Sequence, residues 1–125
     1  MKRRSLLWMM LVLFVTLFAF SGVASAADIV GVWERVNDSE AGMQIRVDPN
    51  GTGTLIRVGQ GSKFSVGTVK WSAIRSNGPN QWSGRSLSTS GDNPVADFTI
   101  EGNGLLKVQV RASVQGQYQE WERIR

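Results

Sequence analysis

Turn-forming residues divide positions 29–124 into short runs, and this spacing of turns limits the possible folds more than any other feature of the chain. Apolar and polar residues alternate within these runs, most clearly in Met43-Gln44-Ile45-Arg46-Val47. A period of two is typical of antiparallel strands that bury one face. Eight strands at this spacing indicate an all-β barrel or sandwich. The predicted strands are 29–36, 42–47, 52–58, 64–74, 81–87, 95–100, 105–112 and 118–124.

The connections between the runs are short. Asp48-Pro49-Asn50-Gly51 has the composition of a type I turn followed by a bulge, and Glu101-Gly102-Asn103-Gly104 predicts a second tight hairpin. Residues 76–80 and 88–94 predict longer, more mobile connections. Because short connections make consecutive strands neighbours, we expect an antiparallel up-and-down sheet.

An open sheet of eight strands has two exposed edges, and closing the sheet into a barrel removes both of them. Trp-Glu-Arg occurs in the first strand and again in the last, so that Trp33 and Arg35 share one face, as do Trp121 and Arg123. If the end strands pair antiparallel, each Trp can meet an Arg diagonally across the seam and gain cation–π attraction. The alternative is a chance match between two strands rich in Trp and Arg.

Three patterns resemble small bacterial lipocalin-like (calycin superfamily) β-barrel domains. Gly31-Val32-Trp33 resembles the Gly-x-Trp of the family's first strand, and Asp48 to Leu55 (DPNGTGTL) resembles a hairpin common in its bacterial members. Arg123 matches the family's late Arg, which packs on that Trp. The resemblance implies an eight-stranded lipocalin-like barrel that binds rather than catalyses. The chain is shorter than the classical members, and we expect no helix beside the barrel.

The first 26 residues have the layout of a secretory signal peptide. A basic start, Lys2-Arg3-Arg4, precedes an apolar run at 6–20, and Ala24-Ser25-Ala26 provides a small-x-small cleavage site. The apolar run is short for a membrane span, although an uncleaved anchor is the alternative. We therefore expect an exported protein, periplasmic or extracellular, whose single domain spans 27–125 and which meets membranes only through this segment.

Composition excludes several functions. Three of the 14 basic residues belong to the signal segment while all 10 acidic residues follow it, so residues 27–125 carry a net charge of only +1. That balance gives no electrostatic reason to bind nucleic acid. The chain has no His and no Cys, which removes the commonest general base, thiol nucleophiles and disulfides. We predict no enzymatic activity, no catalytic residues, no metal and no cofactor.

The barrel interior is the predicted ligand site. An eight-stranded barrel can be filled by side chains or can hold one small ligand. Met43, Trp71, Trp82 and Phe98 are the candidate ligand-binding residues, because aromatic side chains suit apolar pockets. Trp71 and Trp82 flank one loop and are expected at one mouth of the barrel. The inward-facing positions are predicted to be Met43, Ile45, Val69, Trp71, Trp82, Phe98, Ile100, Val108 and Val110.

Two functional classes remain open at this point. The first is a carrier of a small apolar or amphipathic molecule. The second is a protein-binding barrel, such as an inhibitor of an exported enzyme, although such inhibitors usually carry a disulfide. A carrier needs an open, lined interior, whereas an inhibitor needs an exposed segment. If the predicted inward set is simply core, the interior is closed to ligands.

Overall fold

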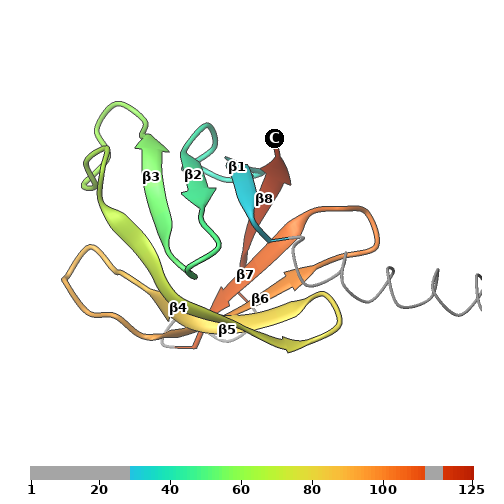
Figure 1. Ribbon diagram of the computed structural model, residues 1–125. Coiled ribbons are helices and arrows are strands. Elements are labelled where there is room, and N and C mark those ends of the chain that lie inside the picture. Colours follow the sequence, from blue (N-terminus) through green and yellow to red (C-terminus); the bar gives the residue numbers. More distant parts are fainter. Residues whose placement is uncertain (1–28, 112–116) are drawn as a thin grey trace, which may run out of the picture.

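The protein is a closed antiparallel β-barrel of eight strands in sequence order (Figure 1). The computed structural model describes residues 29–111 and 117–125. The signal peptide predicted at residues 1–26 lies outside the described residues. Within the described part, no helix is long and apolar enough to cross a membrane. The up-and-down order of the predicted sheet is confirmed.

The strand bounds follow the predicted ones closely in most places. The two outermost strands, β1 and β8, complete the barrel by pairing with each other. The strands are β1 (Gly31–Val36), β2 (Gln44–Val47), β3 (Gly53–Arg57), β4 (Val69–Gly78), β5 (Gln81–Ser86), β6 (Val95–Ile100), β7 (Leu106–Val110) and β8 (Gln119–Arg123).

Both predicted tight hairpins are present. The amide of Gly51 donates to the carbonyl of Asp48 at 3.1 Å, and the amide of Gly104 donates to the carbonyl of Glu101 at 2.9 Å. Both glycines have a φ of 85°, a left-handed conformation that costs glycine little. The long connection expected at 76–80 is wrong, because β4 continues to Gly78 and pairs directly with Gln81.

The fourth strand is the main departure from the predicted pattern. It was expected at 64–74 but runs over Val69–Gly78, and residues 58–68 form turns and loop instead. Val69 is 48% exposed rather than inward-facing, whereas Lys70 and Trp71 are both buried. The reason is a β-bulge: Gly53 pairs with Trp71 and Thr54 pairs with Val69, so Lys70 is an extra residue on β4. A bulge breaks the alternation and re-aims a side chain.

A second irregularity bends β4 further along. Ser72 pairs with Arg85 and Arg75 with Ser83, so two residues of β4 face the single Gly84 on β5. Ala73 lies in this bulge with a φ of 53°. A Cβ on Gly84 would lie 2.8 Å from the carbonyl oxygen of Ser72, so glycine is needed here for the close approach of β4.

Aromatic side chains fill the barrel interior. Trp71 is fully buried and makes edge-to-face contacts with Phe98 and Trp121, at centroid separations of 5.1 Å and 5.0 Å. The Nε1 of Trp71 has no hydrogen-bond partner among the described residues, which costs about 1–3 kcal/mol when such a donor is buried. Of the predicted inward set, Ile100 and Val110 pack against the core while partly exposed. The buried remainder is Met43, Ile45, Trp71, Trp82, Phe98 and Val108.

The predicted pairing of the end strands is confirmed, with a difference in register. Trp33 lies directly opposite Arg123, and Arg35 directly opposite Trp121, rather than diagonally. The guanidinium carbon of Arg123 is 4.4 Å from the centroid of the Trp33 ring, and that of Arg35 is 5.6 Å from Trp121. The end of the barrel at Trp33 is tied further by two bonds to the preceding segment. Trp33 Nε1 donates to the carbonyl of Ile29 at 2.9 Å, and Arg123 Nη1 to that of Val30 at 3.0 Å.

Candidate functional site

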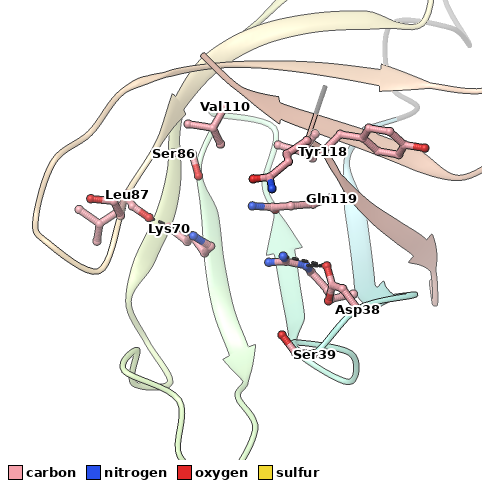
Figure 2. Close-up of a pocket in the computed structure, with 12 residues that line it drawn as sticks. Asp38, Ser39, Lys70, Ser86, Leu87, Val110, Tyr118 and Gln119 are labelled. Atoms are coloured by element: carbon pink, nitrogen blue, oxygen red, sulfur yellow. Dashed lines mark hydrogen bonds and ion pairs between the residues drawn. The ribbon is translucent and has the colours of Figure 1, made fainter. Parts of the chain in front are cut away.

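A pocket of about 660 Å³ opens at the end of the barrel where β1 finishes (Figure 2). Its wall combines charged, polar and apolar side chains from five strands and three connections. Arg35 comes from β1, Lys70 from β4, Ser86 from β5, and Val108 from β7. The pocket therefore lies above the aromatic core, and the side chains around it are more polar than those below.

Lys70 is the most unusual residue of this wall. The bulge turns its side chain into the barrel, where only 5% of the residue is exposed. The Nζ atom donates to the carbonyl oxygen of Leu87 at 2.9 Å and lies 4.4 Å from the centroid of the Phe64 ring. Burial, together with the charge of Arg35, lowers the pKa of Lys70 to about 8, against a weaker opposing effect of Glu40. Desolvation dominates because a buried ammonium loses its hydration.

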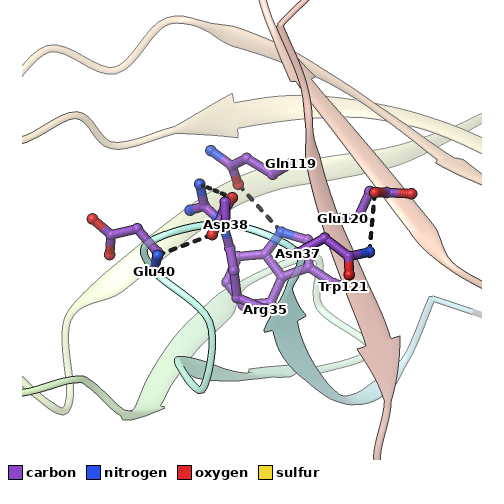
Figure 3. A network of polar contacts seen from close by, with 7 residues as sticks. All are labelled: Arg35, Asn37, Asp38, Glu40, Gln119, Glu120 and Trp121. Atoms are coloured by element: carbon purple, nitrogen blue, oxygen red, sulfur yellow. Dashed lines mark hydrogen bonds and ion pairs between the residues drawn. The ribbon is translucent and has the colours of Figure 1, made fainter.

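Arg35 is held in place from two sides. Its Nε and Nη2 atoms both lie 2.9 Å from Oδ2 of Asp38, and its guanidinium packs over Trp121 (Figure 3). The other carboxylate oxygen of Asp38 accepts a bond from the amide of Glu40 at 2.9 Å. The carboxylate of Asp38 is therefore committed to Arg35 and to its own loop.

Gln119 supplies a further donor from β8. Its Oε1 accepts a hydrogen bond from the Nε1 of Trp121 at 3.2 Å. This bond fixes the amide orientation, so the NH₂ group is the end that remains for the pocket. In Figure 2 the amide of Gln119 and the amino group of Lys70 point toward the same space from opposite sides.

The predicted ligand-binding residues lie deeper in the barrel. Met43, Trp71, Trp82 and Phe98 are all buried members of the core, and none of them lines the pocket. The pairing of β4 with β5 separates the two tryptophans along the barrel: Trp71 lies opposite Ser86, and Trp82 lies opposite Ser76. They therefore do not share one mouth of the barrel. Contact between a ligand and these four residues stays a prediction.

Sequence reasoning missed Lys70 altogether and assigned Arg35 only to the seam. Strict alternation from Trp71 places Lys70 on the outer face, and no local pattern marks the bulge that reverses it. Glycine at position 53, opposite Trp71, is the one hint: a Cβ there would lie 3.0 Å from the Trp71 side chain. Among the described residues no group of acidic side chains is arranged to hold a metal ion.

No match to this chain was found among protein-family models, curated proteins or solved structures.

Proposed function

We propose that the protein is an exported, non-enzymatic, lipocalin-like binding barrel that holds a small amphipathic molecule in the pocket at its open end. The observation that carries this proposal is the pocket itself, about 660 Å³ in volume and lined by charged and polar groups together with Leu87, Val108 and Val110. Pockets of this size accommodate small ligands. The interior around Trp71 is filled by buried side chains, which supports binding in the pocket that borders the core rather than within the core.

The lipocalin-like assignment is supported by the closed end of the barrel. The Gly31-Val32-Trp33 motif and Arg123, on which the resemblance depends, come together in the fold. A Cβ on Gly31 would lie 2.5 Å from the carbonyl oxygen of Arg125, so the glycine permits the last residues to lie close beside the start of β1.

Binding of this kind is moderate in strength. Each CH₂ group moved from water into an apolar site contributes about 0.8 kcal/mol. Loss of translational and rotational freedom on association cancels several of these contributions. An acyl chain of medium length is therefore a suitable probe, because its apolar contacts are large enough to be measured.

The test compares the wild-type protein with a variant in which the pocket is filled. Val110→Trp places an indole at the apolar wall, and Val66→Trp is the matched control, because Val66 is 61% exposed and does not line the pocket. Tryptophan fluorescence and calorimetry with fatty acids of 8 to 12 carbons measure the affinity. We expect Val110→Trp to bind at least tenfold more weakly and Val66→Trp to bind like the wild type.

Failure of the wild type to bind any member of this series below millimolar concentration would overturn the carrier proposal. Equal binding by Val110→Trp and wild type would overturn the placement of the ligand in this pocket. In the first case the protein-binding barrel becomes the better hypothesis.

A further inference from the structure

We infer that the polar side of the pocket is an anion-binding subsite, in which Lys70, assisted by Arg35 and Gln119, holds the carboxylate of the amphipathic ligand. This inference rests on the proposed function and names the chemical class of the ligand. It rests on three features of the described residues: a buried cation without an acidic partner, a convergence of donors, and an apolar wall beside them.

The first feature is the state of Lys70. An ammonium group has three N–H donors. The Nζ atom of Lys70 donates a hydrogen bond to a neutral acceptor, the carbonyl oxygen of Leu87. No ion pair joins Lys70 to an acidic side chain within residues 29–111 and 117–125. The sequence at 112–116, Ala-Ser-Val-Gln-Gly, contains no acidic residue, and the sequence at 1–28 contains one, Asp28. A buried charge of this kind is stabilised when an opposite charge reaches it.

The bulge in β4 is the reason that the charged group of Lys70 is buried. In a regular strand Lys70 would face solvent, where its charge would be hydrated. The extra residue in β4 turns it inward beside Trp71 instead. Bulges that re-aim one side chain occur frequently next to binding and active sites. The chain therefore accepts an energetic cost at Lys70 that a strand without the bulge would avoid.

The second feature is the convergence of donors from three strands. Arg35 on β1 and Gln119 on β8 line the same pocket as Lys70 on β4. Asp38 neutralises Arg35 through a contact of 2.9 Å, so the charged residues of the lining sum to one positive charge. Glu40 is exposed and does not line this pocket. One excess positive charge matches a monoanion, and a carboxylate is the commonest monoanionic head group of amphipathic molecules.

The third feature is the apolar wall. Val108, Val110 and Leu87 line the pocket together with the donors, so a molecule whose head group reaches Lys70 can place its apolar part against these side chains. A fully hydrophilic anion would leave this wall exposed to water. An amphipathic carboxylate therefore fits the pocket better than a small inorganic anion.

The experiment compares two probes of equal chain length, sodium decanoate and decan-1-ol, by calorimetry at pH 7. Lys70→Met removes the charge at similar volume, and Lys63→Met is the matched control, because Lys63 is exposed and lies outside the pocket lining. We expect the wild type and Lys63→Met to bind decanoate at least tenfold more tightly than decanol. Lys70→Met should bind the two probes equally.

A second measurement avoids any dependence on how the variant folds. At pH 9 the amino group of Lys70, whose pKa is about 8, is mostly neutral in the free protein. Its charged neighbours are Arg35, Asp38 and Glu40. We expect the preference of the wild type for decanoate to fall at least threefold from pH 7 to pH 9. The same measurement on Tyr118→Phe tests whether the phenol group that lines the pocket contributes to this change in preference.

The outcomes separate the two proposals. Equal affinity of the wild type for decanoate and decanol overturns the anion subsite and leaves the binding barrel in place. Absence of binding to both probes overturns the binding of amphipathic molecules, and titration with inorganic phosphate then decides the subsite. Phosphate binding that disappears in Lys70→Met would retain a subsite for a free anion, and no phosphate binding would overturn both.

Discussion

Arg123 covers the indole ring of Trp33 at the closed end of the barrel. Two residues further along β1, Arg35 covers the indole ring of Trp121 beside the pocket. Both contacts come from the repeated motif Trp-Glu-Arg. Because β1 and β8 are antiparallel, the Trp of each copy lies opposite the Arg of the other copy. At the closed end the pair is held by the carbonyls of Ile29 and Val30. The pairing of β1 with β8 therefore carries the Trp33–Arg123 contact at one end of the barrel and supplies the pocket residue Arg35 at the other end.

Removal of the segment 118–125 should prevent folding. Without β8, both β1 and β7 lose a partner, and the buried Trp121 leaves the centre of the core. Two exposed edges favour aggregation. We expect circular dichroism to show loss of the β-sheet signal, or size exclusion to show aggregates. Arg125→Ala, which keeps the backbone, serves as the control, and a truncated chain that melts like the full one would contradict the closed barrel.

Arg123→Met should destabilise the barrel by about 1–2 kcal/mol, through loss of the cation–π contact with Trp33 and of the hydrogen bond to Val30. Urea unfolding measures the difference. Arg57→Met is the control on an exposed position of β3 and should have a much smaller effect. Equal effects of the two substitutions would mean that the contact with Trp33 contributes nothing.

Gly84→Ala should cost about 1–3 kcal/mol, because its Cβ would meet backbone atoms of β4 rather than a movable side chain. The carbonyl oxygen of Ser72 lies 2.8 Å and the Cα of Ile74 3.1 Å from that Cβ position. Gly102→Ala is the matched control, since nothing lies within 4 Å of its Cβ position. Thermal unfolding of the two variants checks the prediction, which fails if both melt at the same temperature.

Lys70→Met should change the pH dependence of stability. Because the pKa of Lys70 falls from 10.5 in the unfolded chain to about 8 in the folded one, the unfolded state holds the proton more strongly. Stability therefore rises with pH between these values, by roughly 2 to 3 kcal/mol relative to a variant without the amine. Urea unfolding of wild type and Lys70→Met at pH 7 and pH 10 should show the wild type gaining on the variant by this amount. If the difference in free energy of unfolding between wild type and Lys70→Met is the same at pH 7 and pH 10, Lys70 is not desolvated in the folded state.

The sequence allowed the barrel and its closure to be predicted, because both depend on local patterns that repeat. Alternation places Ile45 and Phe98 inside without knowledge of the partner strands. The two Trp-Glu-Arg strings identify the strands that meet. Tight hairpins such as Asp48–Gly51 are determined by their own residues, since each turn needs Pro and Gly at set positions.

The pocket could not be predicted in the same way. Lys70 enters it because β3 and β4 pair with a one-residue offset, and an offset belongs to two strands rather than to either sequence. The position of Trp82 was misjudged for a related reason. The hairpin after β4 is shorter than its Ser, Asn, Gly and Pro residues indicated, so β5 begins directly opposite Gly78 and the two tryptophans lie apart. Residues whose surroundings depend on register are beyond the reach of a local pattern.

Closure by the first and eighth strands also has a consequence for how folding proceeds in time. During synthesis β1 waits, with one edge unsatisfied, until residues 119–123 have been added, since its partner on that side is β8. Contacts between distant parts of a chain form slowly, because the intervening loop must be ordered first. The barrel of a growing chain therefore cannot close before β8 has been added. For a protein proposed to be exported, this means that the closed barrel forms only when nearly the whole chain is available, which is compatible with passage of an unclosed chain across a membrane.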